Sequence, residues 1–394
     1  MKLTALVSIA FAPLLAFGQS SRETPFPNGS ASIRLPMAVR ANGPYVEVLA
    51  NGRGPFVFEV DTGSMTSPLA SELASEMGLK SSNASHHRSV QIGLAERFTS
   101  RMPLDFASFA GVWPLTGRRI YGALGYSILK HFVVEFDYDR GYLTLYDPQK
   151  YRYSGDGAVF PASLEMGYDP QIAGTLLVSG GLEISVRFTL DTGAGGTVVS
   201  APIVKAHNLL KVIIAKVPNA GKPRVDGVDG LVFETTTARI DAIKLGDLVI
   251  DHPLVSLSTD TSGPFAMEDI GVNLGGNILR RFKVIVDYPR NRVILEPNTH
   301  FHDPFAADAS GLVLEADGPQ FRRIVVHGVV AGSPADQSGI RQDDVITAID
   351  GESTDKYALW EIQDLLKESG ETRKLTIHRH GQTISVTLKL QSLA

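Results

Sequence analysis

The chain has 394 residues, of which 43% are hydrophobic and 20% are charged, and its formal net charge is −5. This composition is typical of soluble globular domains, and without a long basic run it favours neither a nucleic-acid partner nor binding to an anionic membrane surface. Because the chain contains no cysteine, cysteine peptidases, thiolate metal sites and thiol redox chemistry are excluded.

The N-terminus has the pattern of a signal peptide. Lys2 supplies a positive charge, residues 3–17 are almost wholly apolar, and Ala16 and Gly18 are small residues at the spacing that a signal peptidase needs. The apolar run is short for a membrane span. We therefore expect residues 1–18 to be a signal peptide, with no membrane span after its cleavage, and a secreted or periplasmic bacterial protein.

The next part of the chain contains an internal repeat. In the first copy two short strands lead into Asp61-Thr62-Gly63, and in the second copy two strands lead into Asp191-Thr192-Gly193. A stretch predicted to be helical follows each tripeptide; Ser67 is expected to cap the first helix, and Ser200 opens the corresponding stretch in the second copy. Each copy then ends with an apolar Leu-Gly segment and two further strands, the Leu-Gly pairs being Leu124-Gly125 and Leu274-Gly275.

Short strands punctuated by glycine predict a mainly β fold. Because the landmarks recur in the same order, we expect two homologous barrel-like lobes, residues 30–155 and residues 156–297, related by an approximate twofold axis.

The two Asp-Thr-Gly tripeptides predict a pair of carboxyl groups that share a proton. Two carboxylates within hydrogen-bond distance cannot both ionise easily, so the pKa of one of them rises. The ionised Asp can then activate a water molecule while the protonated Asp polarises a carbonyl group. Gly63 and Gly193 allow a tight turn, and the hydroxyl groups of Thr62 and Thr192 are placed to bond across the twofold axis.

These motifs resemble the pepsin and retropepsin superfamily of aspartic peptidases over roughly residues 30–297. The resemblance implies two retropepsin-like β-barrel lobes around a shared cleft, with Asp61 and Asp191 as the catalytic dyad and a polypeptide as the substrate. Ser64 follows the first motif as in pepsin-like enzymes, and Ala194 follows the second as in retropepsins.

The flap is where the sequence departs from pepsin-like relatives. Residues 86–98, which correspond to their flap hairpin, contain no tyrosine. In the second copy, the Gly-rich residues 225–230 are the candidate for a flap.

Three other interpretations of the repeat stay open at this point. Asp-Gly turns can merely connect strands, the two lobes can form an exported peptide-binding protein without catalysis, and each lobe can pair with its copy in a second chain. The occurrence of two repeat-related tripeptides favours an aspartic-type endopeptidase whose dyad lies within one chain.

The C-terminal part changes in character after Pro297. Residues 298–309 are polar and predict a linker. Within residues 310–394, Gly332-Ser333-Pro334-Ala335 is followed by Asp344-Val345-Ile346 and then by Asp350-Gly351, with a helical stretch and two final strands after them. This order resembles a bacterial PDZ domain of the α+β class.

The PDZ resemblance implies a peptide-binding site. Gly311, Leu312, Val313 and Leu314 would form the loop that binds a peptide's terminal carboxylate, while the peptide adds to the sheet as a strand. The alternative is a PDZ fold whose groove is occluded, or one that merely packs on the other lobes. No motif predicts a metal or another cofactor.

Overall fold

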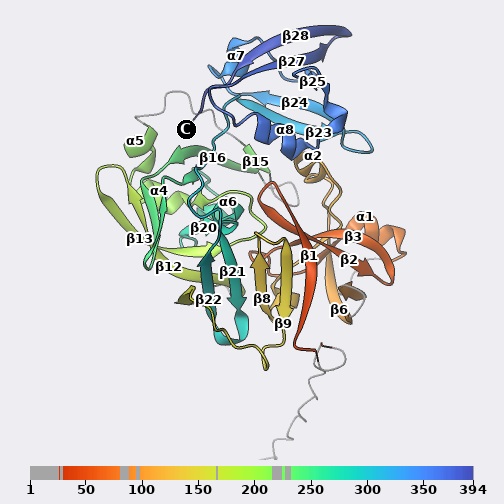
Figure 1. Cartoon of the computed structure of the whole chain (residues 1–394), viewed down its shortest axis with the longest axis vertical. Coiled ribbons are helices and arrows are strands. Elements are labelled where there is room, and N and C mark those ends of the chain that lie inside the picture. Colours follow the sequence, from red (N-terminus) through yellow and green to blue (C-terminus); the bar gives the residue numbers. More distant parts are fainter. Residues whose placement is uncertain are drawn as a thin grey trace, which may run out of the picture.

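The computed structural model describes residues 26, 30–79, 88–94, 98–165, 167–214, 224–226 and 232–393. It is mainly β, with three sheets and short helices (Figure 1). Residues 1–18, the expected signal peptide, lie outside the described residues. Among the helices that are described, none is both long and apolar enough to cross a membrane.

The elements fall into three groups along the chain. Those of the first copy of the repeat are β1 (Ser32–Arg40), β2 (Gly43–Ala50), β3 (Arg53–Val60), β4 (Pro68–Ala70), α1 (Ser71–Glu76), β5 (Arg88–Leu94), β6 (Phe98–Ala107), α2 (Trp113–Thr116), β7 (Gly122–Leu124), α3 (Tyr126–Leu129), β8 (Val133–Asp137) and β9 (Tyr142–Tyr146).

Those of the second copy are β10 (Ala158–Pro161), β11 (Ser163–Glu165), β12 (Asp169–Val178), β13 (Leu182–Leu190), β14 (Val198–Val199), α4 (Ala201–Ala206), α5 (Leu209–Ile214), β15 (Arg224–Asp226), β16 (Val232–Arg239), β17 (Ala242–Leu245), β18 (Leu248–Asp251), β19 (Leu254–Ser258), η4 (Pro264–Ala266), β20 (Val272–Leu274), α6 (Gly276–Leu279), β21 (Phe282–Asp287), η5 (Tyr288–Arg290) and β22 (Arg292–Pro297).

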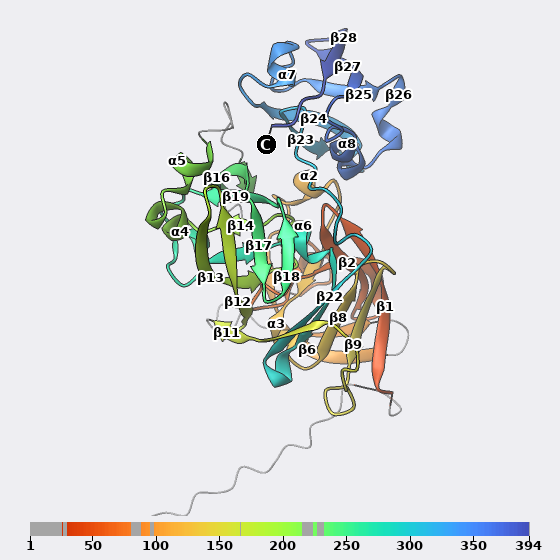
Figure 2. The same cartoon turned by 60° about the vertical axis from the view of Figure 1, so that its left-hand side comes forward.

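The C-terminal group consists of β23 (Leu312–Asp317), β24 (Arg323–Val329), α7 (Pro334–Gln337), β25 (Val345–Ile349), β26 (Glu352–Ser353), η6 (Thr354–Lys356), α8 (Leu359–Leu365), β27 (Thr372–Arg379) and β28 (Gln382–Lys389). These strands form their own sheet around a hydrophobic core separate from the rest. In both views this group sits at one end of the molecule (Figures 1 and 2).

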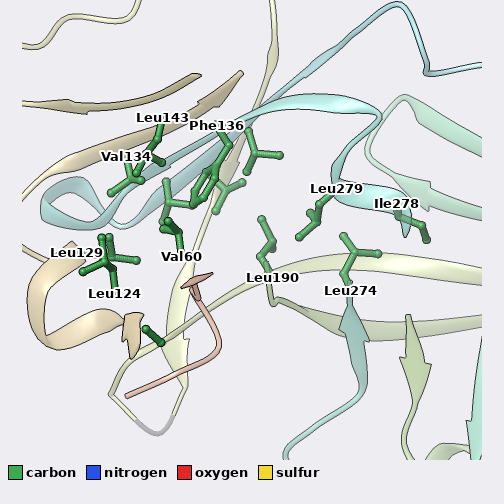
Figure 3. Close-up of a cluster of buried hydrophobic side chains, with 14 of the residues drawn as sticks. Val60, Leu124, Leu129, Val134, Phe136, Leu143, Leu190, Leu274, Ile278 and Leu279 are labelled. Atoms are coloured by element: carbon green, nitrogen blue, oxygen red, sulfur yellow. The ribbon is translucent and has the colours of Figure 1, made fainter. Parts of the chain in front are cut away.

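The two copies of the repeat are joined by a continuous sheet and a common core. The last strands of the copies pair antiparallel, β8 with β21, within the order β10-β22-β21-β8-β9-β1. One hydrophobic cluster extends through both copies. Figure 3 shows part of it, with Val60 and Leu124 from the first copy and Leu190 and Leu274 from the second. The residues that precede each Asp-Thr-Gly are thus anchored in one shared core.

The expected helix cap at Ser67 is wrong. Pro68–Ala70 is strand β4, which pairs with β6, and α1 begins only at Ser71. The reason is a tertiary contact, because the buried Ser67 hydroxyl accepts the N–H of Gly125 at 2.9 Å. In the second copy Ser200 does occupy the N-cap position of α4, although its side chain makes no capping hydrogen bond.

The segment between the repeat and the C-terminal group is held firmly rather than extended as a free linker. The guanidinium group of the buried Arg281 donates to backbone carbonyls of this segment, among them those of His300, at 3.1 Å, and Phe301, at 3.2 Å. Phe301 also packs edge-on against the buried Phe282. The polar composition of the segment did not predict this anchoring, which depends on an arginine from the preceding repeat.

Candidate active site

The two Asp-Thr-Gly turns are held by equivalent backbone hydrogen bonds. Each Asp follows directly on a strand, Asp61 after β3 and Asp191 after β13. The N–H of Asp61 donates to the carbonyl of Leu124 at 3.0 Å, and the N–H of Asp191 donates to the carbonyl of Leu274 at 3.1 Å. The Leu-Gly segment of each copy therefore fixes the start of its own turn, as a structural repeat requires.

The two threonines hold the turns to each other. The hydroxyl of Thr62 accepts the N–H of Thr192 at 3.1 Å and donates to the carbonyl of Leu190 at 2.6 Å. The hydroxyl of Thr192 makes the reciprocal pair, accepting the N–H of Thr62 at 3.1 Å and donating to Val60 at 2.6 Å. Both threonines are fully buried. This crossed arrangement sets how closely the two turns approach.

Replacing Thr62 with Val should destabilise the fold, because it leaves the buried Thr192 N–H and Leu190 carbonyl without partners. At about 1–3 kcal/mol for each such group, we expect a loss of about 2–6 kcal/mol in the free energy of unfolding. Urea unfolding at neutral pH measures it. The matched control is Thr235→Val, since Thr235 is equally buried and its hydroxyl has no hydrogen-bond partner among the described residues. Equal effects in both variants would contradict the bridging role.

The crossed threonines bring the two aspartate side chains together. Burial raises the pKa of Asp61, and the carboxyl group of Asp191 lies close enough to that of Asp61 to raise this pKa further. The close fit is evident at the glycines, because a methyl group added at Gly193 would lie 2.5 Å from Cγ of Asp61, and one at Gly63 would lie 2.6 Å from Cγ of Asp191. Each motif glycine therefore makes room for the opposite aspartate.

The two carboxyl groups have different surroundings. Asp61 Oδ1 accepts the N–H of Gly63 at 2.9 Å. Asp191 accepts two donors, the N–H of Ala194 on Oδ1 at 2.9 Å and the amide Nδ2 of Asn273 on Oδ2 at 2.7 Å. Burial, followed by the charges of Asp191 and Glu59, raises the pKa of Asp61 well above its usual value. Burial thus favours a proton on Asp61, whereas two N–H donors are directed at the oxygens of Asp191.

Glu59 is a third carboxyl group at the site that sequence reasoning missed. It stands two residues before Asp61 on β3, so the two side chains leave the same face of the strand. Its cross-strand partner on β2 is Tyr45. Burial raises the pKa of Glu59 to about 8, against an opposing effect of the Tyr45 side chain.

In the second copy, the positions that correspond to Tyr45 and Glu59 carry no charge. There Thr189 stands two residues before Asp191, and its hydroxyl accepts the amide Nε2 of Gln171 at 3.0 Å. A different carboxyl group lies near this half of the site, because burial and then the charge of Asp191 raise the pKa of Asp169 to about 8. The repeat is therefore symmetric in its backbone and asymmetric in its charges.

These raised pKa values predict that stability falls as the pH rises. Because the folded protein binds these protons more tightly than the unfolded chain, their stabilising contribution is complete below about pH 4. It is lost as the pH rises through about 8. Glu59→Gln should make the slope of unfolding free energy against pH shallower, by at most about 1.4 kcal/mol per pH unit for one proton. Glu47→Gln, on an exposed position of β2, is the control and should leave the slope unchanged. If the Glu59→Gln protein kept the full slope, the raised pKa of Glu59 would be contradicted.

The expected carboxylate-binding loop of the C-terminal group already has internal partners. The N–H of Gly311 donates to the side chain of Asp308 at 2.6 Å, and the N–H of Leu312 donates to the hydroxyl of Ser310 at 3.0 Å. Val313 and Leu314 follow on β23, where Leu314 is buried in the core. Two of the N–H groups that were predicted to bind a peptide carboxylate therefore already donate to side chains of the PDZ domain itself.

Other expected features lie partly outside the described residues. In the candidate flap of the second copy, residues 227–230 are not described, and neither are residues 86, 87 and 95–97 of the corresponding region in the first copy. Among the residues that the structure does cover, no three His, Cys, Asp or Glu side chains are grouped so that they could hold a metal ion.

The family model described as "PDZ domain" matches residues 325–379. The C-terminal group is therefore a PDZ domain, as the sequence predicted. No curated protein matches the chain.

Three solved structures show partial similarity to the chain. The photosystem II D1 C-terminal processing protease is 28% identical over 23% of this chain, with a TM-score of 0.21, and the match spans only 25% of that protease. The aspartic proteinase from Irpex lacteus is 13% identical over 70% of this chain and 100% of its own length, with a TM-score of 0.45. The HtrA3 PDZ domain bound to a phage-derived ligand (FGRWV) is 18% identical over 20% of this chain and 81% of its own length, with a TM-score of 0.19.

Proposed function

We propose that this protein is an aspartic-type endopeptidase that hydrolyses peptide bonds with the Asp61 and Asp191 pair. The observation that carries the proposal is the close approach of the two aspartates, because a methyl group added at Gly193 would lie 2.5 Å from Cγ of Asp61 and one at Gly63 would lie 2.6 Å from Cγ of Asp191. The crossed threonine hydrogen bonds support it, because they hold the reacting groups in place before a substrate arrives.

The different surroundings of the two aspartates support a role for each. Asp191, with two hydrogen-bond donors on its oxygens, acts as the base and takes a proton from a water molecule as the water oxygen bonds to the substrate carbonyl carbon. Asp61 gives its proton to the carbonyl oxygen. In the second half of the reaction the proton on Asp191 passes to the amide nitrogen and the C–N bond breaks, while one hydroxyl group of the tetrahedral carbon gives its proton to Asp61 and becomes the carbonyl of the new carboxylic acid. No covalent enzyme intermediate forms.

Three further proposals concern the lobes, the PDZ domain and the location of the protein. We propose that the two copies form retropepsin-like lobes of a single-chain enzyme, with a polypeptide substrate held between them. We propose that the PDZ domain recruits or regulates substrate, in keeping with the general role of PDZ domains in binding peptides. The signal-peptide pattern of residues 1–18 supports a secreted or periplasmic bacterial location.

Digestion of a broad peptide library at pH values from acidic to neutral tests this proposal. We expect new peptide termini by mass spectrometry and their suppression by a pepstatin-like inhibitor. A folded protein that cleaves nothing across this range while still retaining peptides would support the alternative, a peptide-binding protein without catalysis.

A further inference from the structure

The edge strand of the PDZ sheet is in contact with the first copy of the repeat. Strand β23 ends its sheet and pairs there with β24, so its other edge is the place where a peptide strand would add. Helix α2 of the first copy packs against β23 and lies next to α8 in both views (Figures 1 and 2). A peptide that pairs with β23 must therefore compete with α2.

The contact is closest at Gly117, the residue that follows α2. A methyl group added at Gly117 would lie 2.9 Å from Cβ of Leu359 on α8 and 3.6 Å from Cβ of Ala316 on β23. Both of these PDZ side chains are fully buried. The backbone of Gly117 thus fits between the strand and the helix with no room for a side chain.

A second contact joins the PDZ domain to the β1–β2 hairpin. The guanidinium group of Arg40, at the end of β1, lies over the ring of Trp360 on α8, 4.8 Å from its centre. A cation over the face of an aromatic ring is attracted to it. The PDZ domain is therefore held by two segments of the first copy that are distant in sequence.

Both segments continue to the candidate active site. Next to Gly117, the guanidinium group of Arg118 lies 5.1 Å from the ring centre of Tyr45, the partner of Glu59. Next to Arg40, the turn between β1 and β2 reaches the second copy, where the side chain of Asn42 donates to the carbonyl of Gly195 at 2.9 Å. The PDZ contacts thus lead to one side of Asp61 and to the turn that carries Asp191.

The peptide that fits this edge can be described by its chemistry. Apolar side chains on both sides of this edge belong to the PDZ core, namely Leu312 and Leu314 on β23, Ile362 on α8 and Leu366 directly after α8. The loop before β23 offers N–H groups that now bond to the carboxylate of Asp308 and to Ser310. An extended peptide with a free carboxylate and an apolar last residue would satisfy both features.

We infer that the α2 segment and a peptide C-terminus with an apolar last residue compete for the β23 edge, so that peptide binding releases the PDZ domain from the first copy. Release removes the restraints on Arg118 and on the β1–β2 turn. The consequence for hydrolysis rests on the proposed function, whereas the competition itself does not.

Gly117→Asp tests the competition. Aspartate tolerates the left-handed backbone of Gly117, whose φ is +63°, but it places a charge between Leu359 and Ala316. Gly78→Asp is the matched control, because Gly78 has φ of +69° and no heavy atom within 4 Å of an added Cβ. Each full-length variant also carries Asp61→Asn, so that the probe is not digested.

The probe is a displayed library of random heptapeptides with free carboxyl termini. We expect the Gly117→Asp protein to retain peptides with an apolar last residue at least about tenfold better than the proteins with Gly117 intact, a difference of about 1.4 kcal/mol. Equal retention by all three proteins, or no retention by any, would overturn the inference.

A second measurement follows the effect on hydrolysis in chains with Asp61 intact. Adding the retained peptide should change the hydrolysis rate of the wild-type protein at least about threefold, in the same direction as the Gly117→Asp substitution changes it. The C-terminally amidated form of the peptide and the Gly78→Asp substitution should leave the rate unchanged. An unchanged rate in an active enzyme would overturn the link to the active site. If no form of the protein hydrolyses peptides, the proposed function fails and the binding result still decides the competition.

Discussion

Asp61→Asn and Asp191→Asn should each lower kcat/KM for a cleaved peptide by at least about 10²–10⁴-fold, the usual contribution of a general acid or base. Asparagine keeps the shape of the side chain but can neither hold the shared proton nor take one from water. The rates are measured with the best substrate from the library digestion.

The control for this pair is Asp247→Asn, a change in an exposed turn that should leave kcat/KM unaltered. Urea unfolding shows whether each variant keeps its fold. A folded Asp61→Asn or Asp191→Asn protein with the wild-type rate would remove that residue from the mechanism.

Gly193→Ala should lower kcat by about 10²-fold or more, the effect expected when a reacting group is displaced by about 1 Å. An added Cβ would lie 2.5 Å from Cγ of Asp61, so the carboxyl group must move away from its partner. The backbone of Gly193 is not in the left-handed region, which means that the effect comes from crowding rather than from backbone strain.

Gly196→Ala is the control for this crowding. Gly196 lies three residues further along the chain, and an added Cβ there would have no heavy atom within 4 Å. We expect this variant to keep the wild-type kcat. Equal loss in both variants would point to general damage to the turn, and no loss at Gly193 would contradict the close approach of the two aspartates.

The repeated features were the predictable part of the structure. The matched order of strand, Asp-Thr-Gly and Leu-Gly was enough to place Asp61 and Asp191 at equivalent positions, and the hydrogen bonds to Leu124 and Leu274 follow the same repeat. The PDZ domain was likewise predictable, because its turns depend on local residues such as Gly332 and Gly351, both at positive φ.

The asymmetric features could not be read from the repeat. Among them, Glu59 was the easiest to predict, since a carboxylate two residues before Asp61 must share its face of the strand. Asn273 and Asp169 approach Asp191 from other strands, so no local pattern indicates them. Ser67 was wrongly assigned as a helix cap because its partner, Gly125, is distant in sequence. The packing of α2 on the PDZ domain depends on tertiary contact in the same way.

The most direct test of the central claim, that both aspartates of one site belong to a single chain, is the rate of peptide hydrolysis in an equimolar mixture of Asp61→Asn and Asp191→Asn proteins. If each site is built within one chain, every molecule in the mixture lacks one carboxyl group, and we predict no activity above that of the separate variants. Recovery of a substantial fraction of the wild-type rate in the mixture would show that the first lobe of one chain pairs with the second lobe of another. A substantial rate in either variant alone is expected if each lobe pairs with its own copy in a second chain; either result would contradict the account.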